Sequence, residues 1–365
     1  MQWIYLLAGF VPFVIFDIWY MGIAALWTIK IIIVTYIIIF GICPFIFHYS
    51  YSFQRKILFL NFVHWPPSLD FERPESIGLE GVRNFYLHTD ENVKIGAWQM
   101  LPRSLLNDST ILNDEYFEAT LANASKPVFL YMHGNSGNRG SSHRIELYKV
   151  FQDLDYHLIA FDYRSYGDSD PAELSEIGVV TDSKYVVRWV MNKVNNSAPV
   201  FVWGHSLGTG VSCHALDLLA TENIHPAGLF LESPFNNIAD ELRCHPFAQI
   251  FRHLPWFDWI IVQPFYRNNL RFESDKHSAN IKCPIMILHA EDDSVVPFNL
   301  GEKLYEEIFK SHGNDTEQVQ MVRINASLEL GHKYICRYKP LPSIIQYELI
   351  KLWNFVLQSE KNQVQ

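Results

Sequence analysis

From about residue 126 onward, two hydrophobic patterns alternate regularly along the 365-residue chain. Short apolar runs are typical of buried strands, and apolar residues at three- and four-residue spacing are typical of amphipathic helices. Strands that are repeatedly separated by helices predict one α/β domain, with a mostly parallel sheet and helices on both of its faces. The predicted strands are 127–132, 156–163, 200–203, 227–231, 284–289 and 318–324, and the predicted helices are 142–154, 181–194, 207–220, 298–310 and 341–357.

Two alternating runs, 82–87 and 93–98, come before this regular part and predict an antiparallel hairpin. The polar stretch 105–125 follows them and predicts an exposed loop. We therefore expect the globular domain to extend over 81–358, with a short tail at 359–365.

The first 48 residues form a separate composition class. The run 4–27 is apolar except for Asp17, and 31–47 is apolar except for Thr35, so each is close to the length that crosses about 30 Å of hydrocarbon. Neither run shows the polar stripe of a soluble helix, and the start lacks the basic residues and cleavage site of a signal peptide. The pattern predicts a membrane anchor of one or two passes, followed by an aromatic and proline-bearing connector at 49–80.

The predicted strand at 200–203 stops at Gly204-His205-Ser206-Leu207-Gly208, and a helical pattern starts at once. A G-x-S-x-G pentapeptide between a strand and a helix is a nucleophile elbow. So sharp a turn holds its serine outside the usual dihedral wells and needs small neighbours, which Gly204 and Gly208 provide. We predict that Ser206 is a nucleophile. The alternative is a glycine- and serine-rich turn without chemistry.

A serine nucleophile needs a base, and the base needs an orienting acid. In chains with this elbow the order is serine, acid, histidine. The predicted strand 284–289 runs into a loop that carries three carboxylates. We predict Asp293 as the acid because it comes just before the apolar Val295-Val296-Pro297, and Asp292 remains its rival.

Glu232, directly after the preceding strand, is a less favoured acid. Its other expected role is to bond backbone amides where the chain leaves the sheet. Among the histidines beyond the acid, His332 lies between the last strand and the last helix, and we predict it as the base. His312 is expected to be solvated or to cap a helix, and His205 is expected to be structural because it points away from its neighbour Ser206.

The oxyanion that develops during acyl transfer needs preorganised backbone donors. We predict the amides of Leu207 and Asn135, the latter in the loop after the first parallel strand. The segment 133–140 is glycine-rich but lacks the Gly-Lys-Ser/Thr ending of a phosphate-binding loop. The charged pair in 162–169 is expected to brace this oxyanion loop. No metal-ligand spacing is visible, and the predicted mechanism needs no cofactor.

The segment 234–280 interrupts the alternation with many aromatic and long apolar side chains. Its place between the predicted strand 227–231 and the strand that precedes the acid, 284–289, predicts a lid over the site. Its apolar residues either form a wall for an acyl chain, in contact with the bilayer, or only pack the lid onto the sheet. Its arginines are either phosphate contacts or part of the lid surface: Arg243, Arg252, Arg267 and Arg271.

The formal net charge of −10 argues against binding to a nucleic-acid backbone. The five cysteines have no C-x-x-C spacing, so they predict neither a zinc site nor a disulfide framework.

The charges that flank the apolar segments say little about the side of the membrane on which the globular domain lies. The N-x-S/T sequons favour a lumenal or extracellular domain over a cytosolic one. The candidate N-glycosylation sites are Asn107, Asn123, Asn195, Asn314 and Asn325.

Four motifs together resemble those of the family of α/β-hydrolase domain-containing protein twelve. Members of this family are membrane-anchored serine lipases that act on lysophosphatidylserine and monoacylglycerols. The motifs are Trp203-Gly-His-Ser-Leu-Gly-Thr-Gly-Val211, Leu231-Glu-Ser-Pro-Phe235, Leu288-His-Ala-Glu-Asp-Asp293 and His332-Lys-Tyr-Ile335. The resemblance extends from about Ile57 to Leu357. It implies an α/β-hydrolase fold, an anchor in the endoplasmic reticulum, a catalytic domain that faces the lumen and hydrolysis of single-chain glycerolipid esters. It also implies the roles already given to Ser206, Asp293 and His332.

Two features depart from the family's pattern. Ser165 replaces a glycine that is usual in its D-Y-R-G segment, which would alter this loop slightly. Apolar sequence also replaces the family's longer polar N-terminal tail, which leaves the number of membrane passes open.

Together these features predict a serine hydrolase that cleaves acyl esters of single-chain glycerolipids, with a lipid substrate and a membrane as its partners. A thioesterase of S-acylated proteins would use the same triad and is the first alternative. The second is a non-enzymatic scaffold that keeps the hydrolase fold.

Overall fold

The computed structural model describes residues 2–20, 26–64, 66–106, 112–245, 248 and 251–347. The chain divides into two compact units. One is Met1–Gln54 with Phe247–Asn268, and the other is Arg55–Pro246 with Asn269–Gln365. We call them the anchor unit and the catalytic unit, because the second contains the sheet and the residues that the sequence assigns to the site.

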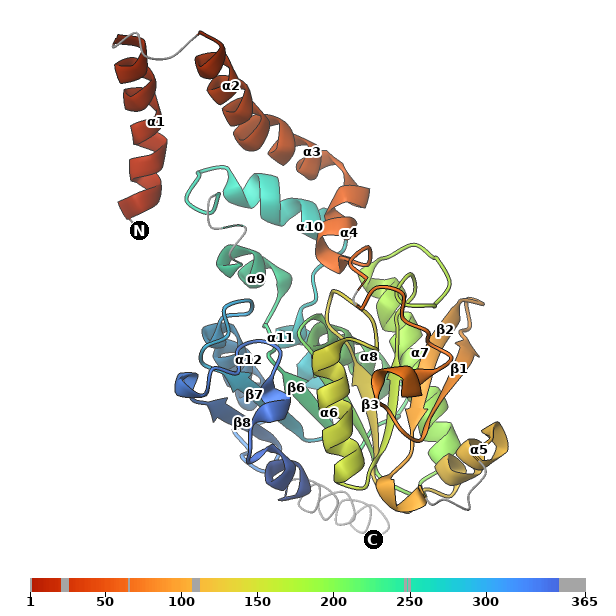
Figure 1. The fold of residues 1–365 in the computed structure, drawn as a ribbon. Helices are drawn as coiled ribbons and strands as arrows, with labels where there is room; N and C mark the ends of the chain where they lie inside the picture. Colours follow the sequence, from red (N-terminus) through yellow and green to blue (C-terminus); the bar gives the residue numbers. More distant parts are fainter. Residues whose placement is uncertain are drawn as a thin grey trace. The chain divides into compact units, whose positions relative to one another are not determined.

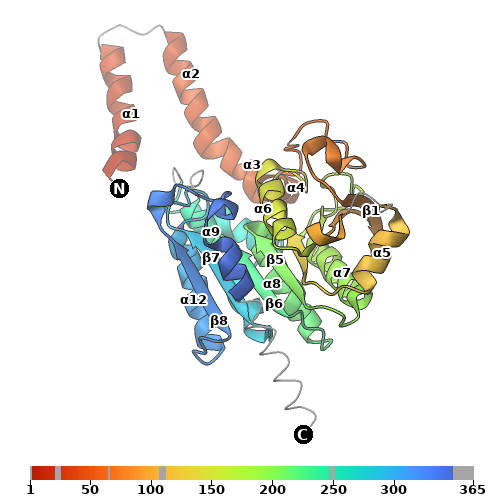
Figure 2. The same ribbon diagram turned by 60° about the horizontal axis from the view of Figure 1, so that its bottom comes forward.

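An eight-stranded sheet lies at the centre of the described part of the catalytic unit (Figures 1 and 2). Its strands, in the order in which they lie, are β1 (Val82–His88), β2 (Lys94–Met100), β4 (His157–Phe161), β3 (Val128–Met132), β5 (Val200–His205), β6 (Gly228–Glu232), β7 (Ile285–Ala290) and β8 (Val319–Ile324). β1 and β2 form the predicted antiparallel hairpin, β2 is also antiparallel to β4, and all pairs from β4 to β8 are parallel. The predicted mostly parallel sheet is confirmed, with β5 in its interior.

Helices bury both faces of the central strands. On one face, Phe129 stacks on Phe151 of α6 (Ser142–Asp153) at 4.4 Å between ring centroids, and Trp203 stacks on Phe230 at 5.1 Å. The helices α7 (Glu176–Val194) and α8 (Leu207–Ala220) cover the opposite face (Figure 1). Burial on both sides is the reason that these strands are continuous apolar runs rather than alternating ones.

Most helix boundaries agree with the sequence pattern, with two differences. α7 begins before the predicted residue 181, because the side chain of Ser175 caps it by accepting a hydrogen bond from the amide of Gly178 at 3.1 Å. The stretch 105–125, which we expected to be a loop, contains α5 (Asp114–Ala122), capped by Asn113. Of the helix predicted at 341–357, residues 341–347 are helical and the rest lies outside the described residues.

The remaining helices of the catalytic unit are short, except for one that follows the loop of the predicted acid. The α-helices are α9 (Ile238–Cys244), α11 (Ser274–His277) and α12 (Phe298–Ser311). The 3₁₀ turns are Pro74–Ile77, Arg103–Leu105, Ser278–Asn280, Ala326–Leu328 and Ile335–Arg337.

In the anchor unit, one described helix is long and apolar enough to cross a membrane, Leu26–Tyr49. It consists of α2 (Leu26–Ile37), a π-helical turn (Ile38–Ile42) and α3 (Cys43–Tyr49). The shorter apolar stretch Phe10–Trp19 lies within α1 (Gln2–Tyr20). After the long helix, α4 (Tyr51–Phe59) leads into the catalytic unit.

The middle of the insertion belongs to the anchor unit, where it forms a π-helical turn (Asp258–Val262) and α10 (Gln263–Arg267). Its aromatic rings pack against the end of the long apolar helix. The pairs are Phe40–Phe251 at 5.7 Å, Phe47–Phe265 at 5.4 Å and His48–Trp259 at 4.4 Å between ring centroids. The aromatic character of the insertion thus has a partner that the sequence did not identify, the apolar helix Leu26–Tyr49.

Candidate active site

The turn between β5 and α8 has the strained geometry of a nucleophile elbow. Ser206 has φ 54° and ψ −121°, a conformation that non-glycine residues rarely adopt. A Cβ atom on Gly204 would lie 2.5 Å from the carbonyl oxygen of Gly208, and one on Gly208 would lie 2.2 Å from that of Met132. No side chain fits at such distances, so the predicted need for glycine at both positions is confirmed.

Asp293 and His332 form a hydrogen-bonded pair, with Oδ2 of Asp293 2.7 Å from Nδ1 of His332. The other carboxylate oxygen accepts the amides of Val295 and Val296, both at 2.9 Å, which fixes its orientation. Burial raises the pKa of Asp293, but hydrogen bonds from His289 and His332 outweigh it and hold the pKa below its usual range. The ionised carboxylate keeps the proton on Nδ1 and leaves Nε2 of His332 available as a base.

This pair lies against the residue that precedes Ser206. Nε2 of His205 is 2.9 Å from the carbonyl oxygen of His332, and the two imidazole rings are 5.0 Å apart. The structure therefore brings Ser206, Asp293 and His332 together at the carboxyl ends of the parallel strands β5, β7 and β8. In the described chain no hydrogen bond joins Ser206 to His332, and in many hydrolases this bond tightens only when substrate binds.

The rival candidates have other partners. Oδ2 of Asp292 accepts the amide of Gly331 at 2.9 Å, so Asp292 holds the loop that carries His332. His312 ends α12, as expected, and its two ring nitrogens lie 2.9 Å and 2.8 Å from main-chain carbonyl oxygens. His205 is buried and bonds the main chain, in agreement with a structural role.

Glu232 is a buried acid whose carboxylate accepts a hydrogen bond from the indole of Trp203 at 2.7 Å. Within the described chain this side chain bonds no backbone amide, so the expectation of such bonds was wrong; the main-chain carbonyl oxygen of Glu232 accepts the amide of Ser206 at 3.0 Å. Burial raises the pKa of Glu232 to about 7, although the bond from Trp203 lowers it. The folded chain thus holds a proton here that the unfolded chain releases at lower pH.

Replacing Glu232 by glutamine is expected to make the stability of the chain less dependent on pH. An unfolded glutamate loses its proton near pH 4.3, so the wild type loses stability as the pH rises from there to about 7, by at most about 1.4 kcal/mol per pH unit. Glutamine keeps an acceptor for Trp203 but does not titrate, so its melting temperature should fall less over this window. The exposed, ion-paired Glu222→Gln is the control, and equal slopes for wild type and Glu232→Gln would contradict the prediction.

The loop after β3 lies against the elbow and offers a free amide. A Cβ atom on Gly134 would lie 3.3 Å from the Cβ atom of Ser206. Leu207 is the first residue of α8, where helix amides have no intrahelical acceptor. Within the described residues, neither the amide of Leu207 nor that of Asn135 donates to a protein acceptor. Two such amides beside a nucleophile can stabilise an oxyanion.

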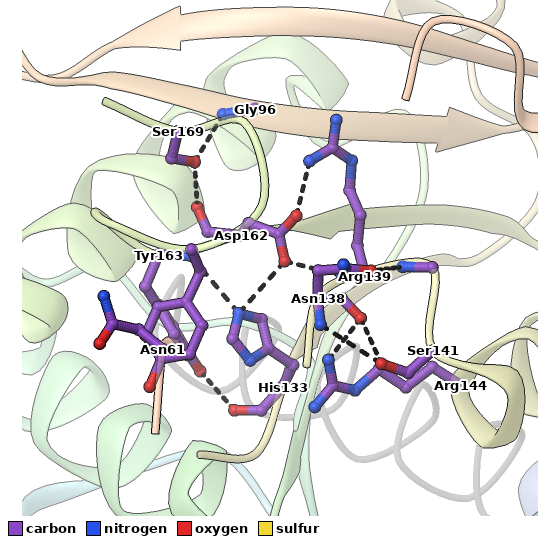
Figure 3. Close-up of polar contacts among 12 residues, drawn as sticks. Asn61, Gly96, His133, Asn138, Arg139, Ser141, Arg144, Asp162, Tyr163 and Ser169 are labelled. Atoms are coloured by element: carbon purple, nitrogen blue, oxygen red, sulfur yellow. Dashed lines mark hydrogen bonds and ion pairs between the residues drawn. The ribbon is translucent and has the colours of Figure 1, made fainter. Parts of the chain in front are cut away.

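A buried ion-pair network fixes this loop (Figure 3). The fully buried guanidinium of Arg139 lies 2.6 Å from Asp162 and 2.6 Å from Asp168, and the amide of Arg139 donates to Asp162 at 2.7 Å. The predicted bracing role of this segment is confirmed for Asp162, whereas Arg164 pairs with Asp182 of α7 at 2.7 Å. Because a buried charge without its partner is costly, by about 3–5 kcal/mol, these pairs stabilise one loop conformation.

Two further side chains bind carbonyl groups of the same loop. Arg144, buried in α6, donates to the carbonyl oxygen of Ser136 at 2.6 Å, and the hydroxyl of Tyr163 donates to that of His133 at 3.0 Å. The sequence analysis did not single out Arg139 or Arg144. The signal in the sequence was one arginine in the loop after the apolar strand and a second in the first turn of the helix that follows.

Ser165 occupies the position at which the family resemblance expects glycine. Its φ of 63° lies in the left-handed region, which explains the preference for glycine. The hydroxyl of Ser165 donates to the carbonyl oxygen of Ala172 at 2.8 Å and accepts its amide at 2.9 Å. The serine therefore keeps the turn and adds bonds that a glycine lacks.

One cluster of metal-ligand residue types lies away from this site. Glu176, His214 and His277 offer ligand atoms within 4.8 Å of one another. Nδ1 of His214 is 2.9 Å from Glu176, however, and Nδ1 of His277 is 2.6 Å from Asp217. The two rings stack 3.8 Å apart with only 12° between their planes, so their lone pairs lie in parallel planes and do not converge on one ion. Two histidine–carboxylate pairs that join α7, α8 and α11 account for the geometry.

The fold and the site define a hydrolase of the α/β class. A family model described as "alpha/beta hydrolase fold" matches residues 127–241. An alpha-beta hydrolase from Vibrio vulnificus is similar with a TM-score of 0.58 at 15% identity, covering 80% of this chain and 92% of that one. An esterase from Pyrococcus furiosus has a TM-score of 0.56 at 18% identity, covering 79% and 97%. At these identities the solved structures support the fold.

Curated relatives identify the particular family. The lysophosphatidylserine lipase ABHD12 of Danio rerio is 39% identical over 320 residues, which are 88% of this chain and 83% of the relative. That of Gallus gallus is 42% identical over 83% of this chain and 79% of the relative, and protein ABHD12B of Homo sapiens is 31% identical over 82% and 80%. The chain belongs to the ABHD12 family of serine hydrolases, and the resemblance inferred from its motifs is confirmed.

Proposed function

We propose that this chain is a membrane-anchored lipase that hydrolyses the acyl ester of lysophosphatidylserine and related single-chain glycerolipids, including monoacylglycerols. The observation that carries the reaction type is the 2.7 Å bond between Asp293 and His332 beside the strained Ser206. The substrate class is supported by the relatives in Danio rerio and Gallus gallus, which are lysophosphatidylserine lipases.

In the proposed mechanism, Ser206 attacks the ester carbonyl while Nε2 of His332 takes its proton. The carboxylate of Asp293 stabilises the imidazolium that results. The amides of Asn135 and Leu207 receive the negative charge that develops on the carbonyl oxygen. His332 then protonates the glycerol oxygen, which leaves.

Deacylation repeats these steps with water as the nucleophile. His332 takes a proton from water, the hydroxide attacks the acyl–Ser206 ester, and the proton returns to the serine oxygen. The products are a free fatty acid and the deacylated glycerol compound. This cycle assigns no step to a metal or a cofactor.

The proposed organisation places a membrane anchor at 1–48, a connector at 49–80 and the hydrolase domain at 81–358, with 234–280 as its insertion and 359–365 as its tail. The apolar helix Leu26–Tyr49 supports the anchor.

An endoplasmic-reticulum location with a lumenal catalytic domain is proposed from the family resemblance and the sequons. Asn107 lies outside the described residues, and the other four sequon asparagines are exposed: Asn123, Asn195, Asn314 and Asn325. Treatment with an N-glycosidase should lower the mass of the cellular protein, and an unchanged mass would argue for a cytosolic domain.

A comparison of substrates tests the proposed function. The full-length chain in detergent is offered a lysophosphatidylserine, a monoacylglycerol and a peptide acylated on cysteine, all with the same acyl chain. We expect kcat/KM to be highest for the lysophospholipid and lowest for the thioester. Preferred turnover of the acylated peptide would replace the lipase by a thioesterase, and no turnover of any substrate would favour a scaffold.

A further inference from the structure

The last residues of the membrane-proximal helix α4 and the turn after them run along the loop that carries Asn135. Leu58 and Phe59 end α4 and are buried, and the following turn has Leu60 at a φ of 45°, which is strained for a residue with a side chain. This segment, residues 58–63, belongs to the catalytic unit together with the loop. We call it the exit segment.

Four hydrogen bonds join the exit segment to the loops of the site. The side-chain amide of Asn135 donates to the carbonyl oxygen of Leu58 at 3.1 Å, and the amide of Gly137 donates to that of Val63 at 3.2 Å. Asn61 donates to the carbonyl oxygen of Ser165 at 3.2 Å. The fourth bond comes from the hydroxyl of Tyr166, which reaches both the exit segment and the loop.

Tyr166 lies between the two segments that it joins. Its hydroxyl is 2.9 Å from the carbonyl oxygen of Asn135 and also contacts that of Phe59, so its single proton is shared between two acceptors. Burial raises the pKa of Tyr166 well above its ordinary value, which keeps the phenol protonated as a donor. The ring is 1% exposed and packs on His133 at 5.0 Å.

These bonds hold Asn135 at its carbonyl group and at its side chain, and its N–H belongs to the preceding peptide, whose carbonyl oxygen on Gly134 lies 2.7 Å from Nδ1 of His133. The carbonyl group is held by Tyr166 and the side chain by Leu58, which leaves the N–H as the free donor beside Ser206. Donors in an oxyanion site must lie within about 3.1 Å of the position that the carbonyl oxygen takes as it becomes negatively charged in the transition state, so a small shift of the Asn135 N–H is costly. A residue held at its carbonyl group and at its side chain cannot easily rotate its N–H, which is therefore preorganised for that task.

We propose that the exit segment is a structural component of the oxyanion site and that Tyr166 is the positioning residue that joins it to the Asn135 peptide. The proposal rests on the oxyanion role given to Asn135 under the proposed function. It makes the stretch that follows the membrane anchor part of the catalytic apparatus rather than a simple tether. Main-chain carbonyl groups supply the contacts, so the geometry of the exit segment matters more than most of its side chains.

Tyr166→Phe in the full-length chain tests the proposal, with Tyr148→Phe as its matched control. Tyr148 is an equally buried tyrosine, but its hydroxyl has no hydrogen-bond partner in the described chain, so its loss leaves no acceptor unsatisfied. For Tyr166→Phe we expect kcat per active site to fall about 10- to 100-fold, with KM changed less than about twofold, because the lost alignment acts on the transition state. Titration of active sites with a fluorophosphonate separates this effect from a loss of folded enzyme.

Hydrogen–deuterium exchange tests the part played by the exit segment. In Tyr166→Phe the peptides that cover residues 58–63 and 133–137 should both exchange faster, whereas Tyr148→Phe should match the wild type. A wild-type kcat per active site for Tyr166→Phe, or unchanged exchange at 58–63, overturns the proposal. Either result leaves the proposed function intact, because that function fails on a different variant, Ser206→Ala with retained activity.

Discussion

Ser206→Ala is expected to lower kcat for hydrolysis of the acyl ester by about a million-fold, to the level that the oxyanion site and substrate binding sustain alone. Alanine keeps the Cβ atom and makes no new contact at the elbow, so the fold should be retained. The loss arises because no other hydroxyl takes the place of the nucleophile beside His332. Labelling by a fluorophosphonate probe should be abolished as well, and a gel of the labelled full-length chain measures it directly.

The control for this variant is Ser212→Ala in α8, the helix that follows Ser206. Ser212 is buried, and its hydroxyl donates to the carbonyl oxygen of Thr209 at 2.9 Å, so it is a serine with a local structural partner. It should label like the wild type. If Ser206→Ala still labels and turns over substrate, the nucleophile is another residue and the proposed mechanism is wrong.

Asp293→Asn is expected to lower kcat by about ten-thousand-fold, the size of effect that loss of the carboxylate has in serine proteases. The structure indicates why an isosteric amide fails. The oxygen that accepts the amides of Val295 and Val296 must remain an oxygen, which turns the new NH₂ group towards Nδ1 of His332. The imidazole then accepts at Nδ1 and carries its proton on Nε2, so it can no longer take the proton of Ser206.

Asp292→Asn distinguishes the two neighbouring acids. Its side chain accepts the amide of Gly331, and an asparagine oxygen can accept the same bond. We therefore expect kcat to fall less than about tenfold, by the loss of one charge-assisted bond. Initial rates on the same substrate, corrected for active-site concentration, compare the two variants. The opposite ranking, with Asp292→Asn the more severe, would assign the acid to Asp292.

Local sequence signals were sufficient for the sheet and for the elbow. Runs such as 127–132 and 284–289 are apolar throughout because both faces of β3 and β7 are buried, and Gly204 and Gly208 are needed because a Cβ atom there would collide with main-chain oxygens. Both are consequences of each residue's immediate neighbours. The helix α5 was missed because its sequence is polar, and only Phe117 and Leu121 of it are buried.

Polar contacts between residues distant along the chain could not be predicted from the sequence in the same way. The pairing of Arg139 with Asp162 depends on which loops end at the same edge of the sheet, and no periodicity along the chain carries that information. The same holds for Tyr166 and Phe59 of the exit segment, which are 107 residues apart along the chain. The aromatic residues of the insertion were visible in the sequence, but their partner on the anchor was not.

By itself, the sequence determined the order of strands and helices, the apolar N-terminal helix and the residue types needed for acyl transfer, because each follows from the spacing of neighbouring side chains. Only the tertiary structure decided which carboxylate faces His332, where Glu232 directs its side chain and which segments hold the Asn135 peptide. A hydrogen bond requires its two atoms within about 3 Å, and for residues distant along the chain that proximity is a property of the packed fold.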